Sequence, residues 1–365
     1  MSQSLQKISL KQLFLFIIQA QIGVGVLSIP FKLSDDAKGG SGLSVIVAGI
    51  ITQIVILMLW GLMNRYPGHN LYQILIHFAG PVLGRLLIAL YIGYFIVLGA
   101  NIMLSAVEVL QRWMLQSTPK WVLLGLFYIM TLYLAREKLN VLARFYTLAS
   151  FLFVPLILLI SYGLTQARLE YTFPIFEAGF PGILKGAKDT TISTYGFEIM
   201  LIILPLVEGT SKQKVFKICM ANVFVTLFYF FVVTTCLMVF NSEQLRIIPE
   251  PVIYLMKTLN FYIFDRADVL FLPIWSITLV CSIVSYCYAA SVGLTEMFNQ
   301  KNHRKFAPYV TLLICGIAIV PVTPVAISLL DQIAGYLAYS FIAIIPAGIL
   351  LLSFLFKRKA GEVPS

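Results

Sequence analysis

The stretch from Leu13 to Pro30, LFLFIIQAQIGVGVLSIP, decides the fold of this chain. It is long and apolar enough to cross a membrane, yet its middle holds residues that weaken an apolar helix: Gln19, Gln21, Gly23 and Gly25. A glycine costs roughly 1 kcal/mol relative to alanine inside a helix. A membrane tolerates broken backbone only where protein or a water-filled cavity satisfies it. We therefore expect a broken first span beside a small-molecule site near the bilayer midplane.

The composition is typical of a chain that lies largely inside a membrane. Its 365 residues are 59% hydrophobic and 12% charged, with a mean hydropathy of +0.91, whereas about a quarter of the residues of a soluble domain are charged. Hydrophobic segments recur along the whole length, so no large soluble domain is expected. A net charge of +10 would indicate nucleic acid in a soluble protein. Here it is explained by positive-inside loops, and no nucleic-acid partner is expected.

Ten segments are long and apolar enough to be transmembrane helices. We therefore predict an all-α polytopic membrane protein with a single transmembrane domain over residues 1–365. The ten spans lie at about 11–32, 43–63, 83–110, 121–135, 144–165, 183–207, 215–240, 268–297, 308–326 and 333–356.

The charges of the loops predict the orientation of the chain. With ten spans both termini lie on one side, and that set of loops and ends carries 16 Lys and Arg, against 10 in the other set. Both termini are therefore predicted to be cytoplasmic. The external connections 166–182 and 241–267 are long, and the second contains a possible short helix at Val252–Leu259. They form either lids over an external vestibule or ordinary solvated loops.

The sixth span, from Ile183 to Leu206, is interrupted as well. Its first half is polar, its second half is apolar, and Tyr195-Gly196-Phe197-Glu198 stands at the junction. Matching breaks in the first span of each half predict an inverted-repeat transporter fold with a ligand site between them. We expect a first repeat at about 11–165, a second at about 183–326 and an extra tenth helix at about 333–356.

The two breaks also predict which chemical group the site would hold. Half-helix N-termini offer free amide groups and positive dipole ends, which suit the carboxylate of a free amino acid. Close helix packing through small residues is the alternative explanation for Gly23 and Gly25. The second break at Gly196 favours the site.

Span three carries a polar face at three- and four-residue spacing. Glu108 lies roughly 21 Å along the helix axis from Tyr94, too far to touch the same small ligand. We expect Glu108 near the outer interface, paired with Arg112 four residues on. The residues of this face are Tyr94, Leu98, Asn101, Ser105 and Glu108.

Two further polar features keep more than one interpretation. Thr278, Ser282 and Ser285 form a stripe on the eighth span that either lines the site or bonds back to its own helix. Glu198 is an acid in mid-span. It could bind a ligand ammonium, carry a proton, or be a neutral, hydrogen-bonded acid inside the bundle.

The chain has no pattern typical of a metal centre or an active site. Its three histidines are scattered, and its five cysteines lie in apolar segments without zinc-site spacing. We find no Walker loop and no Ser/His/Asp or paired-carboxylate constellation. We therefore expect no metal, no cofactor and no enzymatic activity.

Several short motifs, in this order and spacing, resemble the B subunits of GerA-type spore germinant receptors, a family of the amino acid–polyamine–organocation transporter superfamily. The resemblance covers nearly the whole chain. The motifs are Gly23-Val24-Gly25-Val26-Leu27-Ser28-Ile29-Pro30, Gly93-Tyr94-Phe95, Glu108 followed by Thr118-Pro119, Gly196-Phe197-Glu198-Ile199-Met200-Leu201, Gly335-Tyr336 and Lys357-Arg358-Lys359.

The resemblance implies a LeuT-like transporter fold in the inner membrane of a bacterial endospore, working with an A subunit and a lipoprotein C subunit. It also implies a pocket for a small amino acid between spans one, three, six and eight. On this chain the implied pocket residues are Gly23, Gly25, Tyr94, Leu98, Tyr195, Gly196, Cys281 and Ser282. Cys281 and Ser282 depart from the family pattern, where a threonine pair can occur. Glu198, Glu108 and Asn101 remain candidates for a proton path or polar network.

Three functions fit these features. The first is a receptor subunit in which ligand binding shifts a two-state equilibrium and signals to partner subunits. The second is a secondary transporter that moves an amino acid with a proton or sodium ion. The third is a channel within a complex, lined by the polar half of span six and by Asn101 and Ser105.

Overall fold

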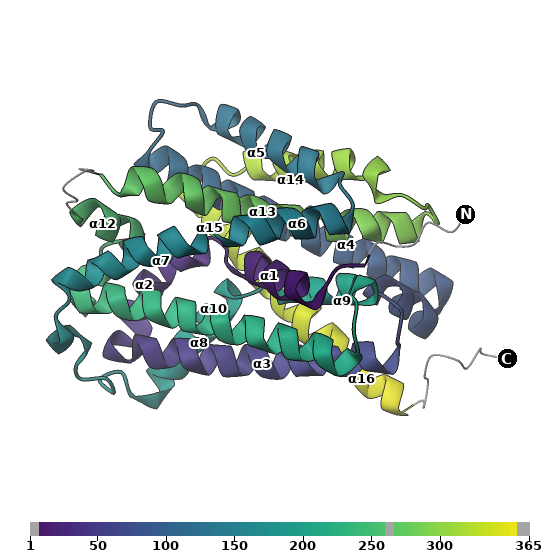
Figure 1. Ribbon diagram of the computed structural model, residues 1–365, viewed down its shortest axis with the longest axis horizontal. Helices are drawn as coiled ribbons and strands as arrows, with labels where there is room; N and C mark the ends of the chain where they lie inside the picture. Colours follow the sequence, from purple (N-terminus) through teal and green to yellow (C-terminus); the bar gives the residue numbers. More distant parts are fainter. Residues whose placement is uncertain (1–6, 260–265, 356–365) are drawn as a thin grey trace.

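The computed structural model describes residues 7–259 and 266–355, which fold almost entirely into helices. Most of the long helices run side by side along the long axis of the molecule (Figure 1). Six described helical segments are long and apolar enough to cross a membrane, and a bent pair adds a seventh. The six are α3 (Ser41–Arg65) with the turn before it, α4 (Leu71–Trp113), α6 (Leu139–Ser150) with α7 (Phe153–Tyr162) and η2 (Gly163–Gln166), α10 (Ser211–Val239), α13 (Asp268–Met297), and α15 (Pro324–Ala338) with η7 (Tyr339–Ile344) and α16 (Ile345–Leu355).

Three shorter apolar segments occupy the positions predicted for the remaining spans. They are α5 (Lys120–Ala135), the run Phe197–Leu206 and α14 (Ala307–Ile319). Every predicted span therefore corresponds to a helical segment of the described chain. The all-α, polytopic membrane architecture is confirmed.

The first span is broken where the sequence predicts. Ser9 caps α1 (Leu10–Gln21) by accepting a hydrogen bond from the Gln12 amide, and α2 (Gly25–Asp36) leaves at an angle of 54°. Pro30 lies inside α2 and does not end it. In Figure 1 α1 lies inside the bundle, with α6, α10 and α13 around it.

The sixth span is broken in the same way. The helix α8 (Gly179–Ser193) stops before Gly196, whose φ of 125° is a backbone conformation that favours glycine. The chain then continues through η4 (Phe197–Ile199), α9 (Met200–Ile203) and η5 (Leu204–Leu206). The end of this span pairs with the start of the first, because the Ile8 amide donates to the Leu206 carbonyl at 2.9 Å.

Three span boundaries differ most from those predicted. The helix α4 starts at Leu71, and Gly80 (φ 79°) followed by Pro81 kinks it before the predicted span begins. The helix α14 ends at Ile319 because Pro321 and Pro324 cannot continue it. The last span starts at Pro324 and contains a π-helical turn, η7. Lys357, Arg358 and Lys359 lie outside the described residues.

The long connection after α10 is folded. It contains α11 (Ser242–Leu245) and α12 (Pro251–Thr258), which confirms the short helix predicted at 252–259. Apolar side chains of α12 are buried, and the helix packs against α2, α10 and α13. The earlier connection, residues 166–182, holds the short turn η3 (Leu169–Thr172), and α8 begins within it at Gly179. One end of the bundle is therefore covered by α12, whereas α16 lies at the opposite end (Figure 1).

Candidate functional site: a cavity at the two helix breaks

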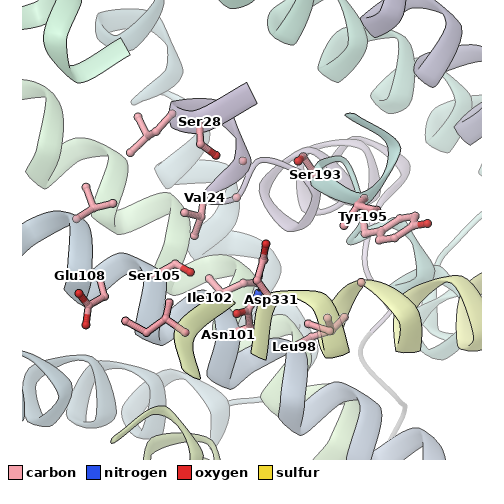
Figure 2. A pocket seen from close by; sticks show the side chains of 18 of the residues that line it. Val24, Ser28, Leu98, Asn101, Ile102, Ser105, Glu108, Ser193, Tyr195 and Asp331 are labelled. Atoms are coloured by element: carbon pink, nitrogen blue, oxygen red, sulfur yellow. The ribbon is translucent and has the colours of Figure 1, made fainter. Parts of the chain in front are cut away.

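A cavity of about 460 Å³ lies where the two broken spans meet. Its walls come from α1, α2, α4, α8, α13 and α15, and its volume is in the range of small-molecule sites. Figure 2 shows Val24 and Ser28 beside the first break, Ser193 and Tyr195 at the second, and side chains of α4 and α15 across from them. The inner end of the cavity is neutral, and its outer end carries charged residues.

The inner end depends on the absence of side chains at the first break. A Cβ atom on Gly25 would lie 2.5 Å from the Cβ of Ser193, so only glycine lets α2 approach α8 this closely. A Cβ atom on Gly23 would meet nothing within 4 Å. Gly25 is therefore needed for packing, whereas Gly23 leaves room for a ligand. Both residues line the cavity, as does Tyr195.

One wall of the cavity is the polar face predicted on the third span. Leu98, Asn101, Ser105 and Glu108 follow one another along α4 and line the cavity (Figure 2). Tyr94 continues this face beyond the inner end, where it is 1% exposed and does not line the cavity. Helical spacing therefore correctly predicted that these four residues share one face, and Tyr94 lies on the same face but outside the cavity wall.

Glu198 is the centre of a buried hydrogen-bond network behind the cavity. Its Oε1 accepts hydrogen bonds from the hydroxyls of Tyr94 and Tyr286, each at 3.0 Å. Its Oε2 accepts the backbone N–H of Gly196 at 2.7 Å. The Gly196 amide can only donate, and the two hydroxyls can donate as well, so the Glu198 carboxyl acts here as a hydrogen-bond acceptor. Glu198 is 2% exposed and does not line the cavity, so it fixes the second break and two helices around it.

The predicted residues of the eighth span also lie behind the cavity. Ser282 donates to the Gln19 carbonyl at 3.1 Å and lies 3.4 Å from the Ile22 carbonyl, so it satisfies backbone freed by the first break. The Cys281 carbonyl accepts the hydroxyl of Tyr146. Thr278 bonds back to its own helix, at the Trp275 carbonyl. Neither Cys281 nor Ser282 lines the cavity, and neither does Gly196.

The outer end of the cavity is held by pairs of charged residues. Asp331 of α15 lies 3.6 Å from the Lys32 ammonium of α2 and accepts a hydrogen bond of 3.2 Å from Nδ2 of Asn101 on α4. Figure 2 shows Asn101 and Asp331 side by side. These contacts join three walls of the cavity across its opening.

The expected pairing of Glu108 with Arg112 is wrong. Glu108 pairs with Lys120 at 2.8 Å, and Arg112 pairs with Glu250 at the start of α12. The sequence could not reveal this because both partners come from other elements. Glu250 lines the cavity, so the connection before α12 does contribute to its mouth. Burial raises the pKa of the Glu250 carboxyl, and this effect is partly offset by Arg112 and Trp113.

Comparisons with known proteins agree with this architecture. The model of a family described as "Spore germination protein" matches residues 7–334. The chain belongs to the spore germination protein family. Relatives include spore germination protein YndE of Bacillus subtilis (strain 168), 26% identical over 98% of both chains. Another is spore germination protein GerQB of Bacillus cereus, 24% identical over 92% of both chains. The resemblance to the B subunits of GerA-type receptors is confirmed.

Solved transporters share the fold of this spore germination family member. A substrate-bound, outward-open Na⁺-coupled sialic acid symporter matches with a TM-score of 0.66 at 13% identity, over 95% of this chain and 79% of that one. Mhp1, a nucleobase-cation-symport-1 family transporter, matches with a TM-score of 0.64 at 12% identity, over 97% and 80%. The LeuT-like transporter fold predicted for this family member is therefore confirmed.

Several residues of the site were not among those predicted, and Tyr286, Asp331 and Gln21 are three of them. Tyr286 lines the cavity and donates to Glu198, and Asp331 comes from a span that was not assigned to the pocket. Gln21 lines the cavity and donates from Nε2 to the Thr194 carbonyl at 3.1 Å, which joins the two breaks. For Gln21, the signal in the sequence was a polar side chain inside an apolar span.

Proposed function

We propose that this chain is the ligand-sensing B subunit of a spore germinant receptor and that it binds a small amino acid in the cavity between the two helix breaks. The observation that supports this most directly is the neutral inner end of the cavity, formed at Gly23, Gly25 and Ser193. A zwitterion has no net charge and needs no charged partner there. Leu98 and Ile192, which also line the cavity, would contact a small apolar side chain.

The proposed location is the inner membrane of the spore, with both termini in the cytoplasm and the cavity open to the outside. The cavity mouth lies at the α12 end of the bundle, because Glu250 lines it. The last described helix, α16, lies at the other end (Figure 1). The excess of Lys and Arg in the loops on the side of the termini supports this orientation.

The proposed partners follow from the family. An A subunit and a lipoprotein C subunit would receive the signal, and membrane lipids would surround the apolar faces of the helices. We also propose that the chain contains two repeats, at about 11–165 and 183–326, and an added tenth helix. Such repeats would place the two breaks opposite each other.

The helix α15 is the wall best placed to respond to the ligand. It contributes Asp331, Ala334 and Gly335 to the cavity and continues into the π-helical turn η7. Such turns are rare and occur often at functional sites. Within η7 the ring of Phe341 stacks on Tyr94, with centroids 5.0 Å apart and planes 8° apart. A shift of α15 would therefore reach Tyr94, and through it Glu198 and the second break.

An amino-acid transporter is the second candidate, because the fold is that of known symporters. The two functions predict different fates for a ligand. We would reconstitute the purified chain in liposomes, impose proton and sodium gradients, and measure accumulation and binding of a panel of amino acids. A receptor subunit binds an amino acid without accumulating it, whereas coupled accumulation would establish transport. Ion currents from the chain alone would favour a channel.

A further inference from the structure

We propose that the side-chain oxygen of Gln21 accepts a hydrogen bond from the ammonium group of the ligand, with the carboxylate at the first turn of α2, as the helix break predicts. This inference rests on the proposed function, since it assigns the two charged ends of an α-amino acid to atoms of the same cavity. The assignment of Gln21 does not follow from the resemblance, because Gln21 is outside the pocket residues that the resemblance implies.

The amide of Gln21 is held in one orientation. Its Nε2 donates to the Thr194 carbonyl at 3.1 Å. A flipped amide would place two oxygen atoms against each other, so the carbonyl of the second break fixes which end is oxygen. Oε1 is thereby directed away from Thr194.

This oxygen is buried without a partner. Gln21 is 0% exposed, and among the described residues nothing donates a hydrogen bond to its Oε1. Gln21 lines the cavity. A buried acceptor left without a donor costs free energy, and a ligand with N–H groups in the cavity would remove that cost. An ammonium group is the strongest such donor that a small amino acid carries.

The carboxylate has a complementary place at the start of α2. The N-cap of this helix is Val24, which has no side-chain group to cap the first turn. The first amide groups of a helix have no partners inside it, and they attract negative charge. Gly25 starts α2 and lines the cavity, so a carboxylate can approach these amide groups.

Backbone carbonyls near the break are less available to the ammonium. Ser282 donates to the Gln19 carbonyl, and Gln21 itself occupies the Thr194 carbonyl. Glu198 already accepts hydrogen bonds from three groups and does not line the cavity. Oε1 of Gln21 is therefore an acceptor at the break itself that is left without a donor among the described residues, whereas the other such oxygen in the cavity wall, Oδ1 of Asn101, belongs to the α4 wall.

The sequence contains a matched control two residues away. Gln19 is also 0% exposed, donates from Nε2 to the Ser150 hydroxyl at 3.3 Å, and has an Oε1 without a donor among the described residues. Unlike Gln21, it does not line the cavity. A comparison of the two glutamines separates ligand recognition from the general effect of removing a buried amide.

The test measures ligand discrimination by the purified full-length chain in lipid nanodiscs. Calorimetric titrations would use the α-amino acids and, for each one that binds, its analogue without the amino group (propanoate for alanine). We expect the wild type to prefer the amino acid by on the order of tenfold or more. Gln21→Met should bring this ratio close to one, whereas Gln19→Met should leave it unchanged.

The possible results are distinct. If Gln21→Met binds ligand and keeps the wild-type ratio, the assignment of Gln21 is wrong and the proposed function stands. If no α-amino acid binds the wild type, the proposed function fails and the inference fails with it. Should Gln21→Met not fold, Gln21→Asn keeps an amide but withdraws it by one methylene group. The same loss of discrimination is expected, and an unchanged ratio would refute the proposal.

Discussion

The hydroxyl of Tyr94 donates a hydrogen bond of 3.0 Å to Oε1 of Glu198, although the two residues are 104 positions apart in the chain. Tyr94 belongs to the helix that forms one wall of the cavity, and Glu198 stands at the break of the sixth span. This bond therefore ties the cavity wall to the backbone of the second break. A change at either residue is therefore expected to alter ligand binding without direct contact with the ligand.

Replacing Glu198 by glutamine should lower stability clearly. The amide brings N–H groups into a position where three donors converge, so at least one donor loses its acceptor. Leaving a buried donor unpaired costs about 1–3 kcal/mol. Thermal unfolding of the purified variant would measure the loss. Glu108→Gln is the control, since removal of its partly exposed pair with Lys120 should cost about 1 kcal/mol at most. Equal effects of the two changes would contradict the role given to Glu198.

Alanine should destabilise the protein at Gly25 but not at Gly23, the two glycines of the first break. Gly25→Ala places a methyl group 2.5 Å from the Cβ of Ser193, and such overpacking costs about 1–3 kcal/mol. Gly23→Ala meets nothing within 4 Å, so stability should change by no more than about 0.5 kcal/mol while the cavity shrinks. Melting temperatures and amino-acid titrations of both variants would test this. A destabilised Gly23→Ala with unaltered ligand binding would be inconsistent with the cavity.

Gly196→Ala should yield little folded protein. Its φ of 125° is strained for alanine, and the new Cβ would lie 2.1 Å from the Ala20 carbonyl oxygen. Strain of this kind costs about 1–3 kcal/mol before the clash is counted. Gly93→Ala is the matched control, since that helical glycine has nothing within 4 Å. Yield and monodispersity in size-exclusion chromatography would report the difference, and similar yields of the two variants would show that the breaks are not packed as described.

Asp331→Asn should loosen α15 and open the cavity. The change removes the ion pair with Lys32 across the mouth, whose side chains are 40% and 56% exposed. Exposed pairs contribute little to stability, about 1 kcal/mol or less, so the protein should still fold. A cysteine introduced at Ser105 would report accessibility through its rate of reaction with a charged thiol reagent. Faster labelling in the Asp331→Asn background is expected. An unchanged rate would remove α15 from the proposed response.

Much of the fold was predictable because the signals are local. Polar residues and glycine inside an apolar span predict a break whichever helices surround that span. Both breaks appear at the predicted places. The polar face of α4 followed from helical spacing alone. Kinks such as Gly80 lie close to a span end, where apolar composition still continues, so hydropathy does not locate them.

The details of the site depended on contacts between distant segments. Helical spacing put Glu108 within reach of Arg112. In the structure Glu108 pairs with Lys120, and Arg112 pairs with Glu250, and both partners come from other elements. The resemblance brought Ser282 to the pocket, and the structure places its hydroxyl on the backbone of the first break. The polarity of Gln21 helped to predict the break but not the direction of its side chain, because a polar side chain in a membrane span can face a cavity or another helix.

The most direct test of the central claim is the position of a bound amino acid, determined by electron cryomicroscopy of the chain saturated with an amino acid that calorimetry shows to bind. We predict ligand density between the first turn of α2, Gln21 and Ser193, with the side chain directed toward Leu98. Density at any other place on the protein, with this cavity empty, would contradict the assignment of the helix breaks as the sensing site.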